Sequence, residues 1–119
     1  PNEGELYYSL GLLLAEEKRL ADAAVALGSA ARLMPQRARV RYNLALALDR
    51  LSRDKGAEAA LLQAFQIDPR DPDIVYATAA FYIQRKQWKR ALPFAERLVE
   101  LVPNDPRPGQ LVASIRRQL

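Results

Sequence analysis

The most constraining feature of this chain is a period of 34 residues, marked by prolines at positions 1, 35, 69 and 103. The segments between these prolines repeat one pattern of apolar and small residues. A fixed period of this length is the signature of a repeat architecture, in which each unit buries its apolar face against its neighbours. The period therefore predicts a stack of similar units.

Small residues recur at two places of every period. When Gly4, Ala38 and Pro72 are taken as first residues, the eighth and twentieth places are Gly11, Ala45, Ala79 and Ala23, Ala57, Ala91. A Gly or Ala lets two helix backbones approach to the short end of the ~8–10 Å interaxial range, while larger neighbours fill the grooves. The pattern therefore predicts tightly packed helix pairs.

The same phase resembles the tetratricopeptide repeat family over nearly the whole chain. The first period matches the family pattern best, with Tyr7, Leu10, Gly11, Leu14, Ala23, Leu27, Ala30 and Pro35. Later periods depart from it at Arg41, Gly56, Val75 and Thr78. The resemblance implies an all-α fold, a right-handed α-solenoid (superhelix) of three helix-turn-helix units and a terminal helix.

The phase also predicts the domain layout: repeats at 4–37, 38–71 and 72–105, then a capping helix at 106–119. Helices are expected at 4–17, 21–34, 38–51, 55–68, 72–85 and 89–102. Asp71 and Asp105, each followed by Pro, are expected to cap the helices that they precede. In the last segment Leu111, Ile115 and Leu119 form a predicted apolar stripe that covers the end of the stack.

Residues 1–3 are in phase with the turns that close the later repeats. We therefore expect them to be the remnant of a preceding repeat or linker, and the chain to be a fragment of a larger protein.

Composition excludes several kinds of chemistry within this chain. It has 119 residues with no His and no Cys, which excludes Ser-His-Asp and Cys-His catalysis, Cys/His zinc sites and covalent haem attachment. Its glycines build no phosphate-binding loop. We expect no enzyme activity, no metal and no cofactor. Nothing in the sequence indicates whether the compartment is cytoplasmic or periplasmic.

A partner-binding surface is the function that remains. In the resembled family, the first helices line a concave groove, and certain places of each repeat face it. The fifth place is a tyrosine in every repeat, Tyr8, Tyr42 and Tyr76. Aromatic residues are enriched at interface hot spots, so these rings are predicted to contact a protein or peptide ligand. The alternative is that they only pack between neighbouring helices.

Other predicted groove residues are mixed in character. The apolar ones are Leu12, Leu46 and Ala80, and the polar ones are Arg39, Asn43, Arg50, Asp73 and Gln84. Arg39 or Arg50 could pair with a ligand carboxylate. Some family members hold chaperone C-termini with a clamp of Lys, Asn and Arg. Only Asn43 fits that clamp, because its other places hold Tyr8, Leu12, Asp73 and Ala77.

Three further readings stay open. The net charge is +4, and basic clusters could bind nucleic acid or an anionic surface, at Arg37, Arg39, Arg41, Arg50, Arg53 and at Arg85, Lys86, Lys89, Arg90. Acidic residues are interspersed among them, so a solvated face is the preferred interpretation and nucleic acid is not the expected partner. The chain could instead be a self-assembly or packing domain that forms a homo-oligomer. Residues 41–112 also resemble repeat tails of larger bacterial proteins, including periplasmic multihaem cytochromes, which implies docking beside a haem domain upstream.

Overall fold

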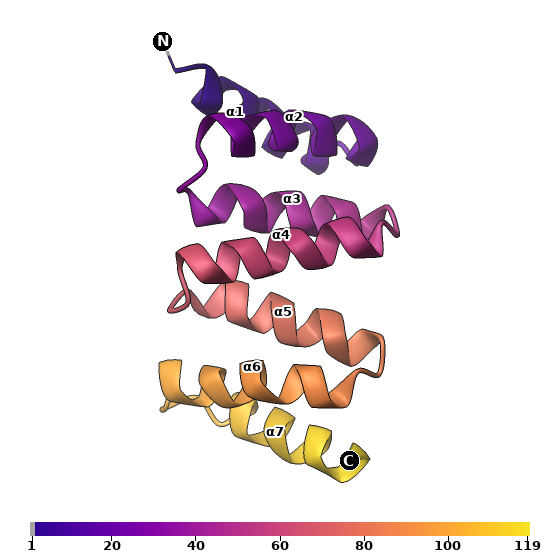
Figure 1. Cartoon of the computed structure of the whole chain (residues 1–119), viewed down its shortest axis with the longest axis vertical. Coiled ribbons are helices and arrows are strands. Elements are labelled where there is room, and N and C mark those ends of the chain that lie inside the picture. The colour runs from indigo at the N-terminus through magenta and orange to yellow at the C-terminus, as the bar shows by residue number, and fades with distance from the viewer. Residues whose placement is uncertain (1) are drawn as a thin grey trace. The chain divides into compact units, whose positions relative to one another are not determined.

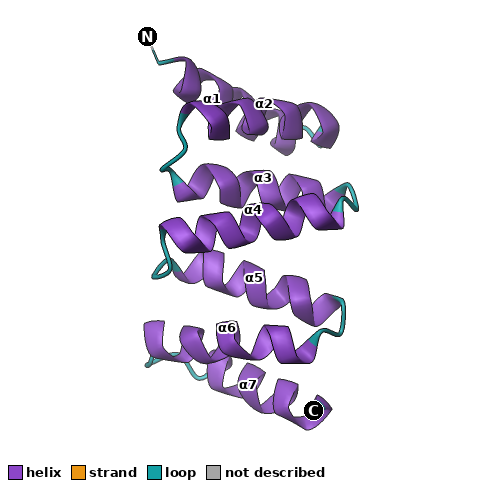
Figure 2. Ribbon diagram, viewed as in Figure 1, coloured by secondary structure: helices purple, strands orange, loops and turns teal. Residues whose placement is uncertain are grey.

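The computed structural model describes residues 2–119, which are helical apart from short loops (Figures 1 and 2). Over that range it has seven helices: α1 (Glu3–Glu16), α2 (Leu20–Leu33), α3 (Ala38–Arg50), α4 (Asp54–Ile67), α5 (Pro72–Gln84), α6 (Trp88–Leu101) and α7 (Arg107–Gln118). They form two compact units, one ending at Asp68 and one beginning at Pro69. The first unit holds α1 to α4 and the second holds α5 to α7. The predicted all-α class is confirmed.

The observed helices begin and end within one residue of their predicted bounds. At α5, Asp71 is the N-cap, and its carboxylate accepts a hydrogen bond from the Asp73 amide at 2.9 Å. The cap predicted at Asp105 is wrong by one residue, because Pro106 is the N-cap of α7. The Asp105 carboxylate still accepts the Arg107 amide at 2.9 Å, so it satisfies one of the unpaired N–H groups of the first turn.

The turn inside each helix pair contains a left-handed residue that is not glycine. Lys18, Ser52 and Lys86 have φ values of 64°, 60° and 58°, and they stand one period apart. Each lies just beyond the end of a first helix. The amide that follows Ser52 donates to the Leu48 carbonyl, and the Ser52 amide donates to the Asp49 carbonyl. The other two turns have the same pair of bonds, which together define a Schellman motif.

Replacing Ser52 by glycine should raise the free energy of unfolding by about 0.5–1 kcal/mol. A non-glycine residue in this region costs about 1–2 kcal/mol, and the greater freedom of glycine in the unfolded chain offsets part of that gain. Ser52→Val should instead lower stability by about 1 kcal/mol, because a β-branched residue is strained at positive φ. Urea denaturation followed by circular dichroism checks both variants. Equal stabilities for the two would contradict the expected backbone strain.

The core of the first unit depends on the small residues that the period predicted. Ala23 and Ala57 are fully buried, and Ala45 is 1% exposed. Gly11 has no room for a side chain, since a Cβ added there would lie 2.6 Å from Leu27 Cγ. α1 packs on α2, α2 on α3, and α3 on α4. The predicted small residues are thus buried in this unit, and Gly11 lies at a close approach of α1 to α2.

The second unit is built around aromatic and small side chains. Tyr82 packs edge-on against Phe81 at 5.5 Å between ring centroids, and it stacks on Phe94 at 6.0 Å. Ala79 and Ala91 are fully buried. Thr78 is also buried, and its hydroxyl donates to the Ile74 carbonyl at 2.8 Å. Thr78, one of the residues that depart from the family pattern, therefore has its hydroxyl hydrogen-bonded within the core.

The face by which α7 packs on α6 differs from the predicted stripe. Pro108, Val112 and Ile115 are buried, but Leu119 is 59% exposed and follows the end of the helix. A spacing of four residues advances by about 400° around an α-helix, so a third residue at that spacing drifts from the buried face. The prediction for Leu119 was wrong, whereas Ile115 does lie at the core.

Candidate partner-binding cavities

The three predicted tyrosines have different surroundings. Tyr8 is half-buried against the cluster that contains Leu27, and its hydroxyl accepts a hydrogen bond from Asn43 Nδ2 at 3.0 Å. The same Asn43 nitrogen donates to the Arg39 carbonyl at 2.9 Å. Tyr8 therefore joins α1 to α3, as the packing alternative expects.

Tyr42 and Tyr76 lie nearer to solvent. The Tyr42 ring is half-buried beneath the Arg39 guanidinium, whose carbon lies 4.6 Å from the ring centroid. Tyr76 is 56% exposed. Tyr76 is thus the one exposed residue among the three predicted tyrosines. Partner contact by these rings stays a prediction.

A cavity of about 360 Å³ in the first unit brings together four of the predicted residues, and we call it the first-unit cavity. It lies between α1, α2 and α3. Its lining is mainly aliphatic with three polar side chains: Leu12, Ala15, Leu20, Leu27, Leu46 and Ala47, with Glu16, Asn43 and Arg50. An apolar pocket with a few convergent polar groups is the usual form of a ligand site.

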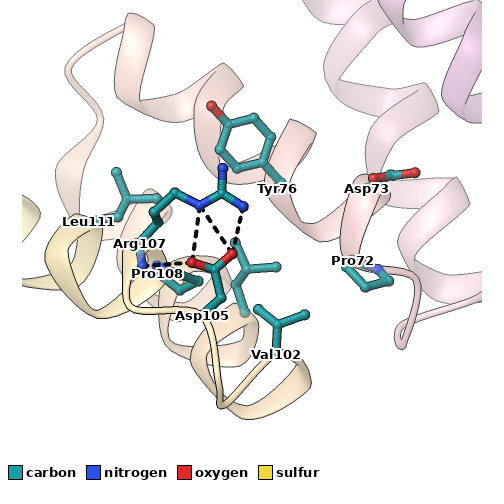
Figure 3. Close-up of a pocket in the computed structure, with 9 residues that line it drawn as sticks. Pro72, Asp73, Tyr76, Val102, Asp105, Arg107, Pro108 and Leu111 are labelled. Carbon is teal, nitrogen blue, oxygen red and sulfur yellow. Dashed lines mark hydrogen bonds and ion pairs between the residues drawn. The ribbon is translucent and has the colours of Figure 1, made fainter.

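A second cavity of about 480 Å³ lies within the second unit, between α5, the end of α6 and the start of α7 (Figure 3). We call it the second-unit cavity. It contains two predicted residues, Asp73 and Tyr76. The rest of its lining was not predicted: Pro72, Leu98, Val102, Asp105, Arg107, Pro108 and Leu111.

An ion pair forms the polar wall of the second-unit cavity. Figure 3 shows the Arg107 guanidinium between the Asp105 carboxylate and the Tyr76 ring. Arg107 Nη2 lies 2.7 Å from Asp105 Oδ2, and Nε donates to both carboxylate oxygens. These bonds and the Arg107 backbone amide lower the pKa of the Asp105 carboxyl from 3.8 to about 2. Because the folded-state pKa is depressed, this stabilisation is present above pH ~4 and is lost as the pH falls toward 2.

Five predicted residues, Tyr8, Arg39, Tyr42, Ala80 and Gln84, are outside the lining of both cavities. Arg107 is the main residue that sequence reasoning missed. It stands one period after Asp73, which itself stands one period after Arg39. Continuing the groove-facing places into the last helix would therefore have found it.

Several arginines of the predicted basic clusters contact their own chain. Arg37 pairs with Glu5, and its guanidinium carbon lies 5.6 Å from the Tyr8 ring centroid. Arg41 donates to the Gln63 side chain. Arg85 lies 3.6 Å from the Phe81 ring centroid and donates to the Phe81 carbonyl at 2.9 Å. Phosphate contacts by these residues would compete with such interactions.

Neither a metal site nor a membrane span is found in the part of the chain that the structure describes. Within residues 2–119, no group of three or more acidic, His or Cys side chains is placed to hold a metal ion. Over the same residues, no helix has both the length and the apolar character to cross a bilayer.

A scan against protein families matches residues 55–115 to the tetratricopeptide repeat family. This chain belongs to that family. Tetratricopeptide repeat folds generally serve as non-catalytic protein-interaction scaffolds. A comparison with curated protein sequences finds no match.

Solved tetratricopeptide repeat structures share the fold of this chain. The TPR2B domain of yeast Sti1, in complex with pHsp70, has a TM-score of 0.85 at 21% identity, with 100% of each chain covered. The first TPR domain of Spaghetti (RPAP3), bound to the HSP90 peptide SRMEEVD, has a TM-score of 0.83 at 17% identity, covering 97% of this chain and 94% of that one. MamA from Desulfovibrio magneticus RS-1 has a TM-score of 0.88 at 22% identity, covering 99% and 67%. These likenesses confirm the α-solenoid fold class.

Proposed function

We propose that this tetratricopeptide repeat chain is a non-catalytic interaction module that binds a segment of a partner protein. The main support for this proposal is that six of the eleven predicted partner-binding residues line one or the other of the two cavities. Both cavities fall in the ~300–1,000 Å³ range of ligand pockets. Each lies within a single compact unit, so each is a complete candidate site by itself.

The solved relatives support binding of a peptide. The yeast Sti1 domain and the Spaghetti domain are complexes with pHsp70 and with an HSP90 peptide, respectively. This chain lacks the basic side chains that a chaperone-tail clamp needs, because Tyr8, Leu12, Asp73 and Ala77 fill four of its places. We therefore expect a ligand of a different kind from an acidic chaperone tail.

The first-unit cavity suits an aliphatic side chain of an otherwise polar segment. Leu12 and Leu46 provide apolar surface, and Leu46 is 38% exposed. Asn43 also lines this cavity and offers an amide oxygen as an acceptor for a backbone N–H. Glu16 and Arg50 carry opposite charges, so this lining gives no large net charge to attract either sign.

The second-unit cavity suits an apolar side chain beside a backbone carbonyl. Tyr76 offers a ring face and a hydroxyl, and Pro108 and Leu111 form an apolar wall. Arg107 is paired with Asp105, which cancels its charge, while Asp73 adds a carboxylate at the rim. A ligand carboxylate would meet Asp73 and Asp105 at close range, so we expect a neutral or basic segment here.

Binding is tested by capture from host lysate followed by measured affinities for the partner segment identified. Leu46→Ala should weaken binding about tenfold or more if the first-unit cavity holds an anchor, and Tyr76→Ala should do so for the second-unit cavity. Val25→Ala and Leu62→Ala are matched controls, because both side chains are exposed and line neither cavity. They should bind as the parent chain does.

Two outcomes would contradict the proposal. One is that the captured proteins and their affinities are the same for the cavity variants and the controls, with all variants folded by circular dichroism. The other is capture of nothing except further copies of the chain, which would favour the self-assembly alternative.

A further inference from the structure

One face of α1 exposes three large aliphatic side chains, Leu6, Leu10 and Leu13, which we call the α1 stripe. They are 67%, 46% and 53% exposed. Their i, i+4, i+7 spacing places them on a single face of the helix. Scattered exposed leucines are ordinary on a protein surface, whereas an aligned apolar patch marks an interaction site. The α1 stripe is therefore a candidate docking surface.

The residues one period later show what covers this face in α3. They are Val40, Leu44 and Ala47; Val40 is fully buried, Ala47 is 3% exposed and Leu44 is half-buried. Their cover comes largely from the second helix of the preceding pair, since the clusters around Val40 and Ala47 include the α2 residues Ala24, Leu27, Ala30 and Ala31. Within the first unit, the same helix face is thus exposed on α1 and covered by α2 on α3.

The last helix lacks an exposed patch of this kind. The large apolar residues of α7 are buried or half-buried, and the exposed residues described along it include Gln110, Arg116 and Arg117. A terminal element of a repeat stack needs such a polar outer face. α1 does not have one, because Leu6, Leu10 and Leu13 leave an apolar face that an occupant could cover.

We propose that the α1 stripe docks the second helix of a further repeat, which lies upstream in the same polypeptide. The stripe continues at its two ends into Glu3 and Glu17, both exposed. The docked helix would resemble α2, with Ala and Leu facing the stripe and basic residues facing the two glutamates. The choice of occupant is supported by the first unit itself, in which α2, the second helix of the preceding pair, covers the same face of α3.

The absence of cysteine from the sequence allows a direct test with single thiols. Leu13→Cys is placed in two chains, the 119-residue chain and the polypeptide that the natural gene encodes, which the proposal expects to include the upstream repeat. Alkylation by iodoacetamide should be fast in the shorter chain and slower by about tenfold or more in the longer one, because a covered thiol reacts only through local opening. Leu10→Cys provides a second reporter on the same stripe.

Val25→Cys is the matched control. Val25 is 70% exposed, and Ala59, one period later, is also exposed, so this place is not covered by a neighbouring repeat. Its thiol should react equally fast in both chains. Circular dichroism shows whether each variant keeps its helix content.

Three results would overturn the proposal. Equal reactivity of Leu13→Cys in both chains would show that no upstream helix covers the stripe. A start codon directly before position 1 would remove the proposed source. Protection in the 119-residue chain that increases with its concentration would identify a second copy as the occupant. None of these results bears on the two cavities, so this proposal and the proposed function can fail separately.

Discussion

Leu27→Ala should lower the free energy of unfolding by about 3–5 kcal/mol, the largest single effect expected in this chain. Leu27 is fully buried, and it packs in a cluster with Ala24 and Ala47 that also touches Tyr8. Truncating a fully buried leucine loses the transfer free energy of its side chain and leaves a cavity that the neighbouring helices fill only in part. Urea denaturation followed by circular dichroism measures the loss, with an unchanged m-value as the sign that compactness is preserved.

Gly11 supplies a second variant that acts on the same contact from the opposite side. A Cβ at position 11 would lie 2.6 Å from two carbons of Leu27, so Gly11→Ala should cost about 1–3 kcal/mol through steric overlap. In the double variant the leucine carbons are gone, so the combined loss should be smaller than the sum of the two single losses. Additive losses would contradict the assigned contact.

Gly28→Ala is the matched control for Gly11→Ala. It lies in the same unit within α2, and a Cβ there would meet only an Arg32 guanidinium nitrogen, at 3.8 Å. Because glycine is a poor helix former, this substitution should raise stability by about 0.5–1 kcal/mol. The same chemical change is thus expected to have opposite signs at two positions.

The helices and the buried small residues could be predicted from the sequence because both follow from the period together with the family pattern that it resembles. Equivalent positions have the same secondary structure in every repeat. The three residues at equivalent positions therefore indicate that structure more clearly than any single residue does. Ala23, Ala57 and Ala91 illustrate this, since all three are fully buried as predicted.

The surroundings of the candidate site could not be predicted in this way. The fifth place holds tyrosine three times, but Tyr8 is bonded to Asn43, Tyr42 lies under Arg39 and Tyr76 is open. Exposure is set by neighbours from other helices, and these differ from one period to the next. Arg107 was missed for a related reason, because the last helix was interpreted only as a cap.

The left-handed turns also escaped prediction. Glycine is the usual marker of positive φ, and Lys18, Ser52 and Lys86 carry no such signal. The hydrogen bonds of the Schellman motif and the packing of the two helices outweigh the local preference of these residues. Once one of these turns is known to contain a residue with positive φ, the 34-residue period predicts the same conformation in the other two.

Ala57→Leu should lower the free energy of unfolding by about 2–3 kcal/mol. Ala57 is fully buried in α4, which packs on α3, so the added carbons force side chains from their rotamers or the helices apart. Ala59→Leu, two residues away in the same helix, is the control, because Ala59 is exposed and its change should stay within about 0.5 kcal/mol. Urea denaturation of both variants gives the comparison. If Ala57→Leu were as stable as the control, the packing of α4 on α3 would not require a small residue at the twentieth place of the repeat. The recurrence of alanine at that place would then be no evidence for closely packed helices.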